Sequence, residues 1–122
     1  MVERREYYRL EQGIPVAHRI TGSLLGGSVK ASDISGGGLS FPTFQKLDRG
    51  MVLNLDITLP GFQKTINAQS RVVWQAESKG SSDRFLVGTQ FVKIEALDRD
   101  KIMRYITLTA RGKYAQNTAI HT

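Results

Sequence analysis

Two arginines near the amino terminus are spaced to bind a single anion. Arg5 and Arg9 lie four residues apart, so their side chains reach the same side whether the segment is helical, about 6 Å apart, or extended, about 13 Å apart. A guanidinium offers a planar set of N–H donors to phosphate oxygens or to the O6/N7 edge of guanine, and it stacks on a flat base. Taken alone, a charged terminal segment is more typical of a solvated surface.

A second polar group precedes a run of three glycines. Asp33 and Ser35 are two residues apart, which places both side chains on one face of an extended chain. The carboxylate can accept hydrogen bonds from N1–H and N2–H₂ of guanine, and the hydroxyl can bond a phosphate or a base edge. Glycines 36–38 allow a ligand to approach the backbone closely. A turn in which Asp33 bonds its own backbone explains the same residues equally well.

Other chemistry has little support. The 122-residue chain has no cysteine and two distant histidines, His18 and His121, which excludes thiolate metal sites and disulfides and disfavours other metal sites. The glycine run is no P-loop, because no Gly-Lys-Ser/Thr follows, and no dinucleotide fingerprint, because no helix follows. We find no nucleophile–base pair. The sequence therefore predicts no metal, no cofactor and no enzyme activity, and His18 is expected to be a surface or hydrogen-bonded residue.

The charge balance favours anionic partners. Lysine and arginine total 17 against 11 acidic residues, a net charge of +6, which suits nucleic acid, nucleotides or acidic proteins. No apolar run approaches the roughly 18 residues of a membrane span, and the amino terminus lacks a signal-peptide core. We therefore expect a cytoplasmic protein without a membrane segment.

Alternation of apolar and polar residues predicts a mainly β fold. The strongest segments are 53–59, 66–75 and 85–91, and shorter ones lie at 14–21, 28–35 and 38–41. Because glycine-rich or proline-containing turns separate them, an antiparallel barrel or sandwich is expected. Trp74 lies an even number of positions from Ile66 and Val72, so a regular strand would point all three side chains to one face. This predicts that Trp74 packs in the core.

The carboxyl-terminal part follows a helical period. Ile102, Tyr105 and Ile106 recur at helical spacing after the acidic start at Asp98, which predicts one helix over about 97–112. The expected organisation is a single domain, with an arm at 1–13, a barrel at 14–96, the helix, and a frayed tail at 113–122.

The ordered set of motifs resembles the PilZ domain family of bacterial cyclic di-GMP (c-di-GMP) receptors. Arg-x-x-x-Arg precedes a small barrel, Asp-x-Ser-x-x-Gly follows, and a helix closes the chain. Two further segments come between them in the family's order, Arg71-Val72-Val73-Trp74 and Val87-Gly88-Thr89-Gln90-Phe91-Val92. The resemblance implies a six- or seven-stranded antiparallel β-barrel with a carboxyl-terminal helix and a flexible ligand-gripping arm.

The resemblance also implies roles for individual residues. Arg5 and Arg9 would clamp phosphates and guanine edges, while Asp33 and Ser35 would hold a guanine. Gly38 would permit the turn that aims them, and Arg4 would bear on whether one ligand molecule or a stacked pair binds. Gly36 and Gly37 are secondary candidates. Ligand binding would order residues 4–9 and alter a contact with a downstream protein, in the regulation of motility or biofilm formation, and a homodimer is allowed.

Two other functions fit parts of the sequence. A single-stranded nucleic-acid binder would explain the positive charge, but it needs exposed aromatic residues, and only Tyr7 and Tyr8 are obvious candidates. A protein-interaction adaptor without a nucleotide would not need the arginine pair, Asp33 or Ser35. Nucleic acid is therefore disfavoured, and c-di-GMP is the expected ligand.

Overall fold

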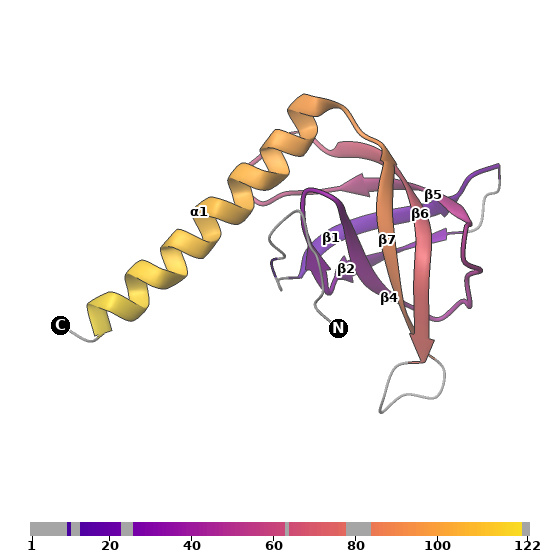
Figure 1. Cartoon of the computed structure of the whole chain (residues 1–122), viewed down its shortest axis with the longest axis horizontal. Coiled ribbons are helices and arrows are strands. Elements are labelled where there is room, and N and C mark those ends of the chain that lie inside the picture. Colours follow the sequence, from indigo (N-terminus) through magenta and orange to yellow (C-terminus); the bar gives the residue numbers. More distant parts are fainter. Residues whose placement is uncertain (1–9, 11–12, 23–25, 63, 78–83, 121–122) are drawn as a thin grey trace, which may run out of the picture.

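The computed structural model describes residue 10 and residues 13–22, 26–62, 64–77 and 84–120, with the backbone alone for 111–120. The described residues form seven strands and one helix (Figure 1). The elements are β1 (Ile14–Ile20), β2 (Gly26–Ala31), β3 (Asp33–Ile34), β4 (Gly38–Thr43), β5 (Val52–Ile57), β6 (Ile66–Glu77), β7 (Phe85–Lys93) and α1 (Ala96–Ile120). The predicted mainly β fold with a carboxyl-terminal helix is confirmed.

The strands form one curved antiparallel sheet that is almost closed into a barrel. Their order is β2-β1-β5-β6-β7-β4-β3, and every ladder in it is antiparallel. Strands β2 and β4 come close together without being neighbours in the hydrogen-bonded order. The barrel therefore has one open seam, between β2 and β4.

Alternating side chains fill the interior. On β5, Leu53, Leu55 and Ile57 are buried, and the intervening Asn54 and Asp56 point outward, where they bond Gln69 and Asn67 of β6. Burial of one such aliphatic side chain contributes about 1.5–3 kcal/mol. Helix α1 adds Ile102, Tyr105 and Ile106 to the same core, so the helix is part of the domain rather than an appendage.

The prediction that Trp74 packs in the core is wrong. Strand β6 contains an irregularity between Val72 and Trp74, where the pairing passes from Val72 opposite Thr89 to Trp74 opposite Gly88. One extra residue in a strand reverses the face to which the following side chains point. Val72 is buried, whereas Trp74 is 38% exposed, so the indole lies on the outer surface of the barrel.

The helix is longer than predicted at its carboxyl end. It continues to Ile120 rather than ending at 112, so the segment expected to be a frayed tail is helical over most of its length. A glycine inside a helix costs only about 1 kcal/mol relative to alanine, and Gly112 therefore does not terminate α1. Among the described residues, no helix combines the length and the apolar character needed to cross a membrane.

Candidate functional site

The loop between β3 and β4 is closed by the hydroxyl of Ser35. The backbone N–H of Ser35 donates to the carbonyl of Gly38 over 2.9 Å. The Ser35 hydroxyl donates to the same carbonyl over 3.3 Å and accepts the N–H of Gly37 over 3.1 Å. Only 4% of Ser35 is exposed. In this geometry the Ser35 hydroxyl closes the loop beside Asp33 and keeps one further acceptor lone pair.

Gly38 is required for close packing rather than for a turn conformation. Among the described glycines, those with positive φ are Gly22, Gly50 and Gly61, so Gly38 does not use the left-handed region. A Cβ atom at Gly38 would lie 2.0 Å from the carbonyl oxygen of Thr89. The absence of a side chain therefore lets β4 begin directly against β7.

Asp33 stands at one end of a row of residues that crosses four strands. Asp33 is opposite Ser40, Ser40 is opposite Gly88, and Gly88 is opposite Trp74. Residues opposite one another in antiparallel ladders point to the same face. Asp33 and Trp74 are therefore both on the outer side, about 14 Å apart for three strand spacings. We call this outer surface of β3, β4, β7 and β6 the Asp33–Trp74 face.

The indole of Trp74 lies directly over Gly88. A Cβ atom at Gly88 would come within 2.0 Å of Trp74 Cε2, so only glycine at this position allows the ring to rest on the sheet. The next outward row on the same strands pairs Gln90 with Arg71, and both side chains are exposed. The Asp33–Trp74 face thus combines a carboxylate, an aromatic ring and a guanidinium. The sequence analysis missed the outward position of Trp74. The one signal for it is Gly88 on the paired strand, which leaves room for the ring.

The amino-terminal arm joins the barrel beside Asp33. Leu10 is 3% exposed, and its N–H donates to the Ile34 carbonyl over 2.8 Å while its own carbonyl accepts the Ile34 N–H over 3.0 Å. Arg4, Arg5 and Arg9 lie outside the described residues. Because Arg9 is the chain neighbour of Leu10, the arginine segment leads directly to the strand that carries Asp33.

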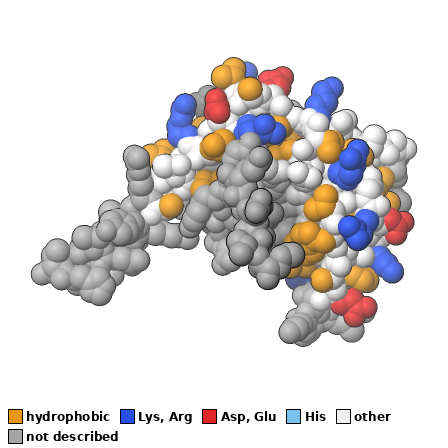
Figure 2. Space-filling view, in the orientation of Figure 1, with side chains coloured by type: hydrophobic (Ala, Val, Ile, Leu, Met, Phe, Trp, Pro, Cys, Tyr) orange, Lys and Arg blue, Asp and Glu red, His pale blue; other side chains and the backbone are white. Residues whose placement is uncertain are grey.

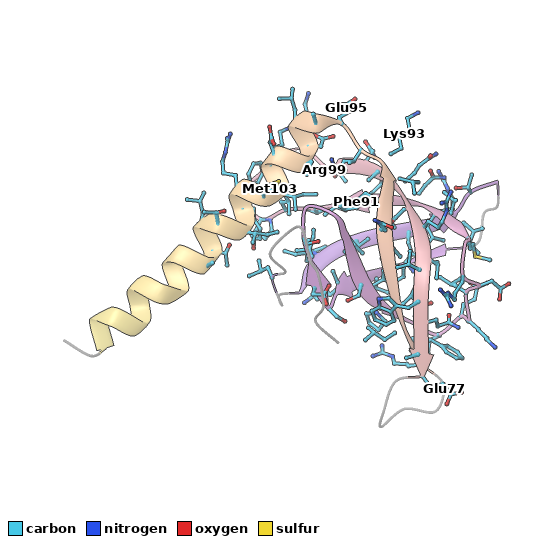
Figure 3. All side chains as sticks on the ribbon, in the orientation of Figure 1. Glu77, Phe91, Lys93, Glu95, Arg99 and Met103 are labelled. Atoms are coloured by element: carbon cyan, nitrogen blue, oxygen red, sulfur yellow. The ribbon has the colours of Figure 1, made fainter. Side chains whose placement is uncertain are left out.

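Helix α1 is tied to the same loop. The Nε–H of Arg99 donates to the carbonyl of Gly36 over 3.0 Å, and Figure 3 shows Arg99 in the first turns of the helix, close to the loop that leads into β4. The residues of the Asp-x-Ser-x-x-Gly motif are therefore held from two sides, by β7 at Gly38 and by the helix at Gly36.

The structure buries His18, so the prediction that it is a surface residue is wrong. It is 8% exposed, and its ring stacks on Phe41 with the centroids 4.8 Å apart. Its Nδ1 is buried and has no hydrogen-bond partner among the described residues. Burial lowers the pKa of the imidazole from its ordinary value of 6.5. Within the described part of the chain, no group of three His, Asp or Glu side chains is arranged to hold a metal ion.

Basic side chains are spread over the surface. Figure 2 shows Lys and Arg side chains scattered across the barrel in the view of Figure 1, interspersed with fewer acidic ones. A surface of this kind attracts anionic ligands.

The fold and the motif loop define a small antiparallel barrel domain with a closing helix. The model of the PilZ domain matches residues 3–108, and the chain belongs to the PilZ domain family. No curated protein matched the chain.

Solved structures of PilZ proteins share the fold. The inhibitor of motility MotI/DgrA from Bacillus subtilis superimposes with a TM-score of 0.79 at 21% identity, covering 92% of this chain and 54% of that protein. The c-di-GMP-bound PilZ domain of YcgR from Escherichia coli gives 0.70 at 15% identity, covering 95% and 98%. The MrkH–c-di-GMP complex from K. pneumonia gives 0.63 at 18%, covering 95% and 56%. The chain thus spans about half of MotI/DgrA and MrkH, and nearly the whole of the YcgR domain.

Proposed function

We propose that the chain is a c-di-GMP receptor whose arm and Asp33–Trp74 face bind the ligand together. The observation that carries this proposal is the pairing of Leu10 with Ile34, since it joins the arginine segment to the strand of Asp33. Two solved relatives, the YcgR domain and MrkH, are known as complexes with c-di-GMP, which supports the choice of nucleotide.

The ligand's chemistry matches the groups on this face. The carboxylate of Asp33 accepts N1–H and N2–H₂ of one guanine. The exposed indole of Trp74 offers a surface on which a purine stacks. Arg5 and Arg9 bind the phosphates and a guanine edge, and Arg4 sets whether one molecule or a stacked pair is held. Ser35, Gly36, Gly37 and Gly38 act by shaping the loop that aims Asp33.

Binding acts as a signal rather than as a step of catalysis. Ordering of residues 4–9 over the face alters a surface that a downstream protein reads. MotI/DgrA is an inhibitor of motility and MrkH is a c-di-GMP-dependent transcription regulator. Control of motility or biofilm formation is the corresponding role for this chain. The receptor acts in the cytoplasm, with one ligand or a stacked pair, as a monomer or a homodimer.

Calorimetric titration with c-di-GMP is expected to give saturable binding, and the emission of Trp74 is expected to fall in parallel. Because the chain has one tryptophan, its fluorescence reports on this face alone. The variant Asp33→Ala is expected to bind at least about 10-fold more weakly, since hydrogen bonds to a charged group contribute about 1.5–3 kcal/mol. It should also lose selectivity for c-di-GMP over c-di-AMP.

Two outcomes would contradict parts of this proposal. Absence of calorimetric binding, together with salt-dependent binding of oligonucleotides, would remove the receptor function in favour of nucleic-acid binding. Saturable c-di-GMP binding without any change in Trp74 emission would keep the receptor function but exclude the Asp33–Trp74 face as its site.

Arg99 is expected to act as a positioning residue for the motif loop. Replacing it with methionine keeps an apolar stem and removes the donor to Gly36, and one such hydrogen bond contributes about 0.5–1.5 kcal/mol. We expect c-di-GMP affinity to fall by about 3- to 10-fold and amide exchange at Gly37 to accelerate. The control Arg104→Met changes an exposed arginine of the same helix and should leave both values unaltered. If Arg99→Met and Arg104→Met lowered c-di-GMP affinity equally, the effect would come from the lost positive charge and not from the hydrogen bond to Gly36.

A further inference from the structure

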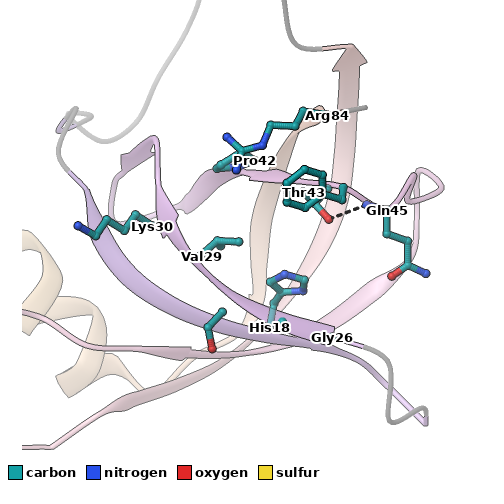
Figure 4. A pocket seen from close by; sticks show the side chains of 11 residues that line it. His18, Gly26, Val29, Lys30, Pro42, Thr43, Gln45 and Arg84 are labelled. Carbon is teal, nitrogen blue, oxygen red and sulfur yellow. Dashed lines mark hydrogen bonds between the residues drawn. The ribbon is translucent and has the colours of Figure 1, made fainter. Parts of the chain in front are cut away.

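A pocket opens at the seam of the barrel, away from the Asp33–Trp74 face. It has a volume of about 480 Å³ and lies between β2, the end of β4 and the start of β7 (Figure 4). Its lining includes His18, Gly27, Val29, Lys30, Phe44 and Arg84. The pocket adjoins the Thr43–Phe85 end of the β4–β7 ladder, whereas the motif loop adjoins the Gly38–Gln90 end. The two sites are therefore at opposite ends of these strands.

The pocket exists because a strand position opposite His18 carries no side chain. Gly27 is paired with His18 across the β1–β2 ladder, so both residues face the same side of the sheet. A Cβ atom at Gly27 would lie 3.6 Å from His18 Nε2, which is an ordinary contact. A larger side chain would fit there and fill space that the protein leaves open. Gly26 differs, because its Cβ would lie 2.1 Å from the His18 carbonyl oxygen.

His18 places a hydrogen-bonding group at the base of this pocket. Figure 4 shows its ring rising from β1 toward the space between β2 and β4. Burial lowers the pKa of the imidazole, which favours the neutral form of the ring. A neutral imidazole has one N–H donor and one acceptor nitrogen. Nδ1 is buried without a described partner. Burying an N–H group without a hydrogen-bond acceptor costs more than burying an unpaired acceptor nitrogen. We therefore place the proton on Nε2, on the side of Gly27.

The charged groups of the pocket are all basic. Lys30 and Arg84 are in its lining, and no described aspartate or glutamate is. The guanidinium of Arg84 lies 4.7 Å from the centroid of the Phe44 ring, so a cation and an aromatic surface are presented side by side. A ligand here needs a negative group for the cations and the Nε2 donor, and a flat apolar body to contact Phe44 and Val29.

We propose that the seam pocket is a second ligand site of this protein, which binds a planar organic carboxylate. Pockets of about 300–1,000 Å³ hold small organic molecules, and 480 Å³ is too large for a simple inorganic anion alone. The carboxylate accepts from His18 and pairs with Arg84, while the ring lies between Val29 and Phe44. This site does not depend on c-di-GMP binding at the Asp33–Trp74 face.

Titration of the ¹⁵N-labelled chain with benzoate tests the proposal, with uncharged benzamide as the matched ligand. We expect saturable amide shifts at Gly27, Val29 and Thr43 with benzoate, no shift of the Trp74 indole, and at least 10-fold weaker binding of benzamide. Gly27→Val should abolish the shifts by filling the pocket, and Arg84→Gln should weaken benzoate at least 5-fold. Both variants should keep wild-type c-di-GMP binding, which also checks that they fold.

Three results would overturn the second site. These are an absence of shifts at the pocket residues, shifts of equal size with benzamide, and unchanged benzoate binding in both variants.

Discussion

Replacing Arg9 with alanine is expected to weaken c-di-GMP binding by about 100-fold or more while leaving the midpoint of thermal unfolding nearly unchanged. A guanidinium that grips a phosphate or guanine edge forms two charge-assisted hydrogen bonds, each contributing about 1.5–3 kcal/mol. Arg9 directly precedes Leu10, whose pairing with Ile34 fixes where the arm meets the barrel. Calorimetric titration of the variant with c-di-GMP measures this loss.

Two further variants separate the shape of the Arg9 side chain from its charge. Arg9→Lys keeps the charge but loses the planar set of donors, and it should still bind at least 10-fold more weakly than the wild type. Arg19→Ala removes one positive charge from an exposed position of β1, a strand outside the Asp33–Trp74 face, and should change the affinity less than 2-fold. If Arg9→Ala and Arg19→Ala weakened binding equally, the arginine pair would be a diffuse electrostatic contribution and not a clamp.

The strands could be predicted from the sequence because burial in a barrel imposes a period of two. Leu53, Leu55 and Ile57 alternate with polar residues in the chain and are buried in the structure. Trp74 shows the limit of the same rule. The irregularity after Val72 turns Trp74 to the opposite face. Because it shows only in the pairing of β6 with β7, the alternation of residues within one strand does not predict it. The greater length of α1 could not be predicted either, because a glycine such as Gly112 weakens a helix but does not determine where it ends.

The candidate residues could be named from the sequence, but their arrangement in the fold could not. Asp33 and the arginine segment could be named from residue types and spacing, and the pairing of Leu10 with Ile34 is what relates them. The local bonds of Ser35 could not be predicted from the sequence, because its hydroxyl meets the Gly37 N–H and the Gly38 carbonyl only once the loop has folded. The pocket at His18 depends on which strands fail to pair, and sequence alone does not reveal the seam between β2 and β4.

Replacing Gly38 with alanine is expected to lower the free energy of unfolding by about 3 kcal/mol, at the upper end of the range for overpacked sites. The new Cβ would lie 2.0 Å from the Thr89 carbonyl oxygen and 2.9 Å from Gln90 Cα. These are backbone atoms of a paired strand, so they cannot rotate away as a side chain would. Strand β4 must therefore separate from β7 at this point, and urea denaturation followed by Trp74 emission measures the loss.

The same substitution should also reduce c-di-GMP affinity in the fraction that stays folded. The carbonyl of Gly38 accepts the N–H and the hydroxyl of Ser35, so a shift of Gly38 moves the loop that follows Asp33. Gly27→Ala is the matched control, since its Cβ meets no described atom closer than 3.6 Å, and both stability and c-di-GMP binding should stay near wild type. If Gly38→Ala were as stable as Gly27→Ala, close packing of β4 against β7 would not be the reason for a glycine at position 38. Direct contact of Gly38 with the ligand would then be the alternative explanation.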